Sequence, residues 1–296
     1  MPSQARLLAA DASLVGIAVI WGATFPLGKI VLRQVPPFQY LALRFALASV
    51  LMLPFAWRDV VRMRAQDVRR GLLAGVVLFS GAALQTLGLA HTTAGKAGLI
   101  TGLNVVIVPL ILLVWLRRLP DALTAAGVVA ATCGLWLLTW QGERFTPGDG
   151  LVLGCAVAIA VHLILVGRYA AALPPAGFAL LQIAVVAVLA GAAGLVVEPR
   201  VTVISAGVAG AIAFMAVGAT LVAYLAQSWA QRIVSPTRTG LLFTVEPVAA
   251  VAFGMLWLGE TLGLRQSAGA AVILAGVVMG ELGRRREAEG IAEDAA

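Results

Sequence analysis

The sequence predicts an all-α membrane protein with ten transmembrane helices, arranged as two inverted five-helix repeats. Three observations lead to this fold class. The chain of 296 residues is 61% hydrophobic and only 12% charged, whereas a soluble domain carries about 25% charged residues. Apolar runs of about 20 residues, the length of helix that crosses a bilayer, follow one another along the chain. The second half of the chain repeats part of the sequence of the first half.

We expect short loops between the spans, so that neighbours in the sequence pack as antiparallel neighbours in space. The ten expected spans are residues 12–33, 38–57, 70–90, 96–116, 122–140, 148–168, 175–197, 204–230, 236–258 and 264–282. They form a first repeat, 12–140, and a second repeat, 148–282, followed by a short cytoplasmic tail, 283–296. We expect the polar tail to be disordered after Arg286.

The repeat is clearest in the fourth span, 96–116, which returns as the ninth, 236–258. The two halves align at one constant offset, without a gap, from Gln85 to Gly134. The aligned pairs include Gln85 with Gln227, Lys96 with Arg238, Asn104 with Glu246 and Gly134 with Gly276. A gap-free repeat of this length indicates duplication of one structural unit.

The distribution of Lys and Arg predicts the orientation. If both termini lie on one side, that side receives 14 Lys and Arg residues and the other side receives 6. Cytoplasmic loops carry the excess of positive charge, so we expect both termini in the cytoplasm. Five spans are an odd number, and the second repeat must therefore enter the membrane upside down. Repeats of inverted topology are typical of secondary transporters.

The spans also carry motifs that resemble the drug/metabolite transporter superfamily, in the form of a permease built from two EamA domains. The motifs are Trp21 to Phe25, Arg44-Phe45, Thr92 to Gly98, Glu246-Pro247-Val248, Leu258-Gly259-Glu260, and Gly269 with Ala275-Gly276. They occur in the family's order over nearly the whole chain. The resemblance implies a multi-pass carrier of the bacterial inner membrane that exports amino acids or other metabolites. The chain is similar to the aromatic amino acid exporters, and this resemblance implies a central cavity between the two halves.

Two charged residues inside the spans are candidates for this cavity, because an ionisable group at mid-membrane costs roughly 2.5–3.5 kcal/mol and needs a partner or a function. In a structural role, protonated Glu246 donates a hydrogen bond to the carbonyl freed by Pro247 or to a facing helix. In a functional role, it binds a proton or the ammonium group of a substrate. Arg44 either locks two helices through an ion pair or hydrogen bonds to carbonyls, or it contacts a substrate carboxylate.

Uncharged polar and aromatic residues complete the candidate set. Duplicate glutamines on symmetric helices fit an inter-helix hydrogen bond or a cavity lining, and a lone intramembrane histidine is more often hydrogen-bonded across helices than a ligand. The predicted substrate-binding residues are Trp21, Thr24, Arg44, Gln85, Asn104, His162, Tyr224, Gln227 and Glu246. We expect the first, third, fourth, sixth, eighth and ninth spans to line the cavity.

Other functional classes lack their motifs in this sequence. There is no Gly-x-x-x-x-Gly-Lys-Ser/Thr loop for nucleotide, and no Gly-x-Ser-x-Gly or His-Glu-x-x-His motif for hydrolysis. We expect no cofactor and no metal, because the two histidines, His91 and His162, lie far apart on different helices. We also expect no nucleic-acid partner, because the net charge of +7 fits loops that contact lipid headgroups. A membrane enzyme acting on lipid headgroups and a passive channel are the alternatives to an amino acid exporter.

Small residues predict one further contact. Gly127 and Gly134 in the fifth span, and Gly269 and Gly276 in the tenth, are each seven residues apart. Such spacing lets two helices approach closely. We expect these spans to pack tightly, either inside one chain or across a homodimer.

Overall fold

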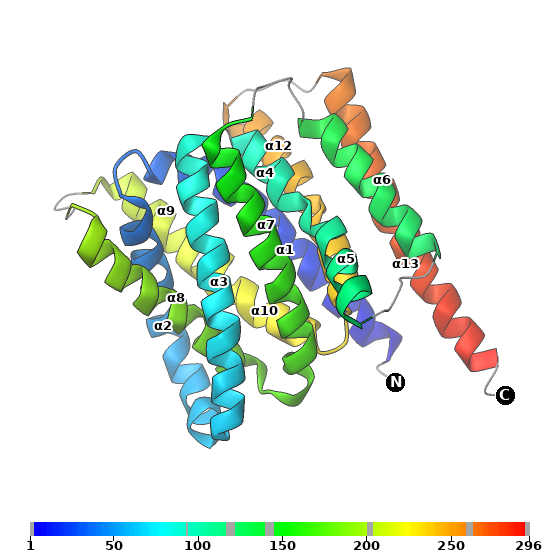
Figure 1. The fold of residues 1–296 in the computed structure, drawn as a ribbon, viewed down its shortest axis with the longest axis horizontal. Coiled ribbons are helices and arrows are strands. Elements are labelled where there is room, and N and C mark those ends of the chain that lie inside the picture. The colour runs from blue at the N-terminus through cyan, green and yellow to red at the C-terminus, as the bar shows by residue number, and fades with distance from the viewer. Residues whose placement is uncertain are drawn as a thin grey trace.

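The computed structural model describes residues 3–92, 94–116, 122–139, 145–199, 204–258 and 263–293, and every regular element among them is a helix. In chain order the elements are α1 (Gln4–Val31), α2 (Pro37–Arg62), α3 (Ala65–His91), α4 (Ala94–Gly102), α5 (Asn104–Leu116), α6 (Ala122–Thr139), α7 (Pro147–Tyr169), the 3₁₀ turn η1 (Ala170–Ala172), α8 (Pro175–Val197), α9 (Ala206–Ala216), the π-helix η2 (Val217–Val222), α10 (Ala223–Ala230), α11 (Pro236–Phe243), α12 (Val245–Leu258) and α13 (Leu264–Glu293). The start of α1 and the end of α13 lie at the same edge of the bundle (Figure 1).

Seven helical segments of the described chain are long and apolar enough to cross a membrane, and Ala122–Leu138 and Leu264–Gly280 are shorter apolar helices. The prediction of an all-helical, multi-pass membrane protein is therefore confirmed. Each predicted span coincides with one helix or with consecutive helices, while the crossing of the bilayer by all ten stays a prediction. The expected disorder after Arg286 is wrong as far as Glu293, because this Ala- and Glu-rich stretch continues α13. Gly259 and Glu260, the end of one predicted motif, lie outside the described residues.

Most helix starts follow from local sequence. Proline stands at the first position of α2, α7, α8 and α11, where its missing N–H costs nothing and its fixed φ suits a helix. Thr146 and Asp149 form a capping box at the start of α7, which satisfies two backbone donors. Serine side chains cap the starts of α1, α9 and α11 in the same position.

The fourth and ninth spans are each interrupted near the middle. α4 ends at Gly102 and α5 begins at Asn104, whereas α11 ends at Phe243 and α12 begins at Val245. Pro247 explains the second break, because a proline ring clashes with the carbonyl four residues earlier, and that carbonyl belongs to Phe243. When the two halves are aligned through Asn104 and Glu246, the breaks fall at neighbouring positions.

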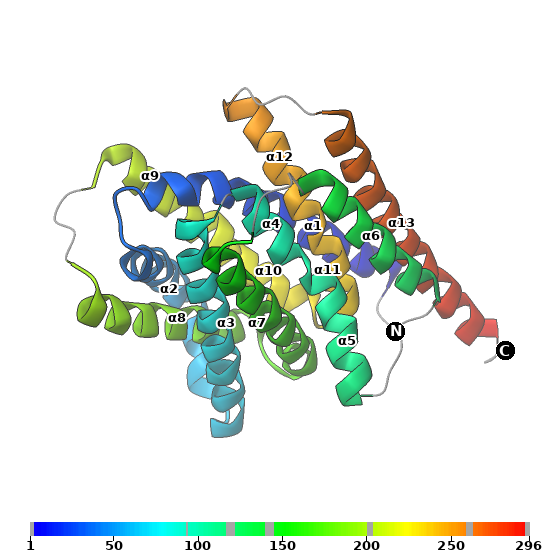
Figure 2. The same ribbon diagram turned by 45° about the horizontal axis from the view of Figure 1, so that its top comes forward.

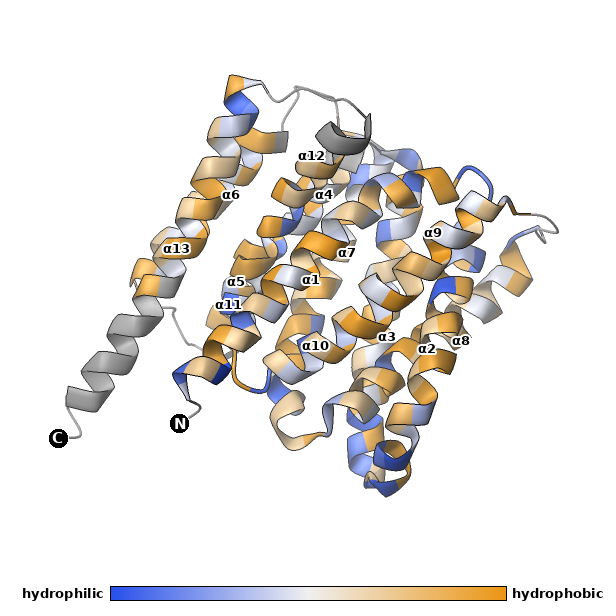
Figure 3. Cartoon of the chain, turned by 180° about the vertical axis from the view of Figure 1, so that it is seen from behind, coloured by the Kyte–Doolittle hydropathy of each residue, from blue (hydrophilic) through white to orange (hydrophobic). Residues whose placement is uncertain are grey.

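The flanks of the bundle are apolar. Hydrophobic residues cover the sides of the helices in Figure 3, and large side chains such as Phe55, Val188 and Leu195 are exposed. Such a surface suits lipid and would be unusual on a soluble protein. Inside the bundle, α2 packs against α8, and α6 packs against α13 as a pair at one side (Figure 2).

Glycines make the α6–α13 contact close. A side-chain carbon added at Gly276 would lie 2.7 Å from the carbonyl oxygen of Gly127 and 2.8 Å from the backbone nitrogen of Ala131. One added at Gly134 would lie 2.6 Å from the backbone nitrogen of Ile273. The two glycine stripes therefore face each other inside one chain, and the homodimer through these helices stays a prediction.

We expect Gly276→Ala to lower the free energy of unfolding by about 1–3 kcal/mol, because its methyl group forces two backbones apart. Gly16→Ala is the matched control: Gly16 is an exposed helical glycine in α1 with nothing within 4 Å of an added carbon. That control should be neutral or stabilising by up to about 1 kcal/mol. Unfolding in mixed micelles measures both, and equal effects of the two substitutions would contradict the packing described.

Candidate functional site

A cavity with a volume of about 60 Å³ lies among helices of both halves of the chain. Its polar and charged wall consists of Thr24, Arg44, Gln85, Thr86, Thr101, Asn104, Tyr224 and Glu246, and its apolar wall of Trp21, Leu41, Phe45, Leu78, Ala82, Ile159 and Phe243. The two breaks therefore open onto this cavity, because Asn104 begins α5 and Glu246 lies in the first turn of α12.

Seven of the nine predicted substrate-binding residues line this cavity, and His162 and Gln227 do not. The expected set of spans needs one correction, because the second span, α2, contributes Leu41, Arg44 and Phe45 to the wall. Thr86, Thr101 and Phe243 were missed. Thr101 and Phe243 lie three residues before the candidates Asn104 and Glu246, a spacing that places side chains on the same helix face and would have found both.

The π-helix η2 ties two other helices to the cavity wall. The carbonyl oxygen of Ala219 accepts hydrogen bonds from Trp21 Nε1, at 2.9 Å, and from Arg44 Nη2, at 3.0 Å. Thr220 Oγ1 accepts from Arg44 Nε at 2.7 Å and donates to the carbonyl of Met215 at 2.9 Å. A π turn inside an α-helical span is rare and occurs often at functional sites. Here it gives α1 and α2 one common acceptor.

Arg44 is held in place by these contacts. A third hydrogen bond runs from its Nη1 to the hydroxyl oxygen of Tyr40, at 3.0 Å. The guanidinium has five N–H groups, and these three bonds use three of them. Arg44 thus locks α2 to η2, as one of the two interpretations of the sequence expected, and the same side chain also lines the cavity.

Glu246 lies in the opposite half of the sequence and reaches the same cavity. The chain packs closely beside it, since a side-chain carbon at Gly22 would lie 2.7 Å from the carbonyl oxygen of Glu246. Within the described ranges its carboxyl group makes no hydrogen bond or ion pair, so the expected bond to a carbonyl freed by Pro247 is not formed there. A carboxyl group without a protein partner, in a cavity wall, is available to a proton or a ligand.

Four aromatic rings form a continuous part of the wall. Trp21 meets Phe243 edge-on with centroids 5.0 Å apart and lies 5.8 Å from Tyr224. Phe45 lies 6.1 Å from Tyr224. These separations are those of interacting aromatic pairs. The rings make a rigid apolar surface between the charged groups.

Asn104 provides a buried polar group without a protein partner. The residue is 4% exposed, and its Oδ1 has no hydrogen-bond partner among the described residues. An unpaired buried acceptor costs about 1–3 kcal/mol, a cost that a bound ligand or water relieves. Gln85, one of the duplicated glutamines, donates to Thr101 Oγ1 at 3.5 Å.

His162 and Gln227 belong to a polar network behind the cavity wall. His162 Nε2 lies 2.7 Å from Gln182 Oε1, across the contact between α7 and α8. Gln227 Nε2 donates to Gln231 Oε1 at 2.9 Å, and Gln231 Nε2 donates to the carbonyl of Leu163 at 2.9 Å. His162 thus finds its partner on α8, whereas Gln227 bonds to Gln231 one turn later on the same segment, and its Oε1 has no hydrogen-bond partner among the described residues.

Known proteins resemble this chain along most of its length. The model of the EamA-like transporter family matches residues 8–140 and again residues 146–280. An "uncharacterized transporter" of Archaeoglobus fulgidus is 30% identical over 274 residues, which cover 93% of this chain and 86% of the relative. The Bacillus subtilis protein YyaM, also described as an uncharacterized transporter, is 26% identical over 284 residues, 90% of this chain and 91% of the relative. A protein of known crystal structure shares the fold, with a TM-score of 0.79 at 20% identity over 94% of this chain and 99% of that chain.

We expect Arg44→Lys to lower the free energy of unfolding by about 1.5–3 kcal/mol, because an ammonium group cannot reach Ala219, Thr220 and Tyr40 at once. Arg70→Lys is the control, since Arg70 pairs with Asp67 of its own helix near the surface and such pairs contribute about 0–1 kcal/mol. Unfolding in mixed micelles compares the two. An Arg44→Lys protein as stable as the parent would show that η2 does not depend on the guanidinium.

Proposed function

The chain belongs to the EamA-like transporter family of membrane transporters, and we propose that it is a secondary transporter that exports amino acids by alternating access. Aromatic and neutral amino acids are the first candidates. The membrane we propose is the bacterial inner membrane, with both termini in the cytoplasm. The observation that carries the proposal is one cavity whose wall contains Arg44, Glu246 and four aromatic rings.

A zwitterion with an apolar side chain complements this wall. A guanidinium forms charge-assisted hydrogen bonds with a carboxylate, and Glu246 offers a carboxylate to the ammonium group. The rings of Trp21, Tyr224 and Phe243 offer a surface to an aromatic or aliphatic side chain. The unpaired oxygen of Asn104 adds an acceptor for a further N–H group of the substrate.

Alternating access is supported by the arrangement of the two halves. α1 and α7, which begin the two proposed repeats, start at opposite edges of the bundle (Figure 1), as inverted repeats require. The fourth and ninth spans are interrupted at nearly equivalent positions. Discontinuous helices at the meeting of two inverted repeats form substrate and ion sites in many secondary transporters. Ten spans in two inverted repeats of five therefore remain our proposal for the membrane topology.

Proton coupling through Glu246 is the mechanism we propose for export. The carboxyl group of Glu246, which has no hydrogen-bond or ion-pair partner among the described residues, can change charge as the cavity opens to one side or the other. A proton biases only those states that differ in their affinity for it, and hydration of Glu246 differs between a closed and an open cavity. Binding and release of the proton would then accompany the passage of the amino acid.

We expect Glu246→Gln to abolish transport driven by a pH gradient and to retain substrate exchange with a raised KM, because the amide carries no exchangeable proton and offers the ammonium group only a neutral acceptor. Flux of labelled amino acids in proteoliposomes, with and without a pH gradient, measures both activities. Asp67→Asn, at the start of α3, is the control and should behave like the parent. A folded Glu246→Gln protein with full gradient-driven transport would show that Glu246 does not couple.

The same proteoliposomes separate the alternatives. A carrier gives saturable flux and counterflow, whereas a passive channel gives neither. An enzyme acting on lipid headgroups gives no flux and a changed lipid composition. Within the described ranges, no group of three or more His, Cys, Asp or Glu side chains could hold a metal ion.

We expect phenylalanine to compete with transport at least about tenfold better than phenethylamine or 3-phenylpropionate. Each analogue lacks one of the two charges, and it would leave Arg44 or Glu246 without its partner in the cavity. Inhibition constants in proteoliposomes measure the difference. Equal competition by the amine would contradict an amino acid substrate and would favour organic cations.

A further inference from the structure

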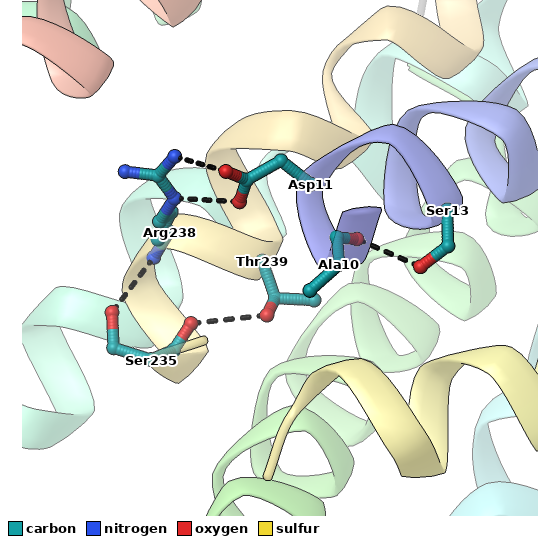
Figure 4. Close-up of polar contacts among 6 residues, drawn as sticks. All are labelled: Ala10, Asp11, Ser13, Ser235, Arg238 and Thr239. Carbon is teal, nitrogen blue, oxygen red and sulfur yellow. Dashed lines mark hydrogen bonds and ion pairs between the residues drawn. The ribbon is translucent and has the colours of Figure 1, made fainter. Parts of the chain in front are cut away.

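An ion pair joins α1 to α11 at the edge of the bundle that holds the start of α1. Arg238 Nε donates to Asp11 Oδ1 at 2.9 Å, and Arg238 Nη2 donates to Asp11 Oδ2 at 2.7 Å (Figure 4). The side chains are only 9% and 14% exposed. This bidentate geometry is the strong form of an ion pair. It connects residues 227 positions apart, unlike the pair of Asp67 and Arg70 within α3.

The pair lies on the axis between the cavity and this edge. Asp11 precedes the cavity residue Trp21 on the same helix by about 15 Å. Between them lies one buried apolar cluster that includes Leu14, Ile17 and Leu242. The ion pair is therefore the outer of two layers, and the apolar cluster is the inner one.

The start of α11 holds Arg238 in position for this contact. Ser235 caps the helix, its Oγ accepting from the backbone nitrogen of Arg238 at 3.4 Å, and Thr239 Oγ1 donates to the carbonyl of Ser235 at 3.0 Å (Figure 4). The break after Phe243 separates α11 from α12. The segment bound to Asp11 is thus the short helix α11, which ends at a break beside the cavity.

An aspartate at the other edge has an equivalent place. The alignment that relates Pro36-Pro37 to Pro174-Pro175 also relates Asp11 to Asp149. Asp149 is fully buried at the start of α7, and it accepts a hydrogen bond from the hydroxyl of Thr92, just before α4. Lys29 Nζ donates to the carbonyl of the same threonine. One aspartate thus holds the start of α11, and its equivalent holds the approach to α4.

We propose that the Asp11–Arg238 pair is a latch that keeps the cavity closed at the end that holds the N-terminus, and that Asp149 with Thr92 is its counterpart at the opposite end. Opening one end requires its latch to break, so that α11 or α4 can swing about the break in its span. Alternating access requires that both latches are not open together. The proposal rests on the transport function proposed above, but its test needs no transported substrate.

The test measures access to the cavity from each side. Ala82, in the cavity wall, is replaced by cysteine in a chain that carries Cys133→Ser and Cys155→Ser. A membrane-impermeant maleimide is applied to right-side-out and inside-out vesicles. We expect Asp11→Asn and Arg238→Gln each to raise the labelling rate from the N-terminal side about fivefold or more, the effect of a typical coupling between sites. The rate from the opposite side should not rise.

Three further variants make the result specific. Exchange of the two residues, Asp11→Arg with Arg238→Asp, should restore the parent rate, because the pair is formed again. Arg238→Lys keeps the charge and loses the bidentate geometry, so we expect an intermediate rate even if the neutral variants fail to fold. Asp67→Asn breaks an ion pair within one helix and should leave the rate unchanged.

Unchanged labelling in the Asp11 and Arg238 variants would overturn the latch, as would an equal rise with Asp67→Asn or an exchange variant that labels as fast as the single ones. Amino acid flux, measured on the same proteins, separates this inference from the proposed function. A parent chain without flux would contradict the transport function alone, whereas intact flux with unchanged labelling would contradict the latch alone.

Discussion

The cavity wall depends on the hydrogen bonds that the carbonyl oxygen of Ala219 accepts from Trp21 and Arg44. A bilayer offers no water to backbone groups, so every backbone polar group inside it needs a partner from the protein. The guanidinium of Arg44 has the same need, and both needs are met where η2 widens the eighth span into a π turn. Trp21 donates to the same oxygen. Three helices distant in sequence are thereby fixed around one side of the cavity, and the aromatic wall follows from their positions.

The bundle contains two kinds of helix: long helices packed closely in pairs, and spans interrupted beside the cavity. The pairs α2–α8 and α6–α13 pack closely over long helices, and the second is held by backbone contacts at glycines such as Gly134 and Gly276. The interrupted spans are short segments on either side of the cavity. Their outer ends are held by polar contacts that water can replace, at Asp11 and at Asp149. Closely packed helix pairs, combined with two interrupted spans that can bend at their breaks, suit a site that opens alternately to two sides.

The sequence predicted the helices well because the thickness of the bilayer fixes the length of an apolar span. It also predicted that polar residues inside spans point inward, and for Arg44, Asn104 and Glu246 that means the cavity. It could not separate the cavity from other interior partners. His162 and Gln227 point inward too, but they meet Gln182 and Gln231 instead. These choices depend on helix rotation, which apolar sequence does not specify.

Other features left weaker signals. No residue type marks the π turn at η2, which is seen only in three dimensions. Thr101 and Phe243 were detectable, since they lie three residues before Asn104 and Glu246 and that spacing places side chains on the same helix face. The break before Pro247 follows from proline chemistry, whereas the break at Leu103 has no proline beside it and is matched only through the repeat.

An experimental structure in lipid with a bound aromatic amino acid tests the central claim most directly. The account predicts the ligand in the cavity, with its carboxylate at Arg44, its ammonium group near Glu246, and its ring against Trp21, Tyr224 or Phe243. The contacts of Trp21 and Arg44 with the Ala219 carbonyl should persist. A ligand bound elsewhere, for example in the groove lined by Asp59, Arg62 and Arg70, or a cavity filled by a lipid tail, would contradict the account.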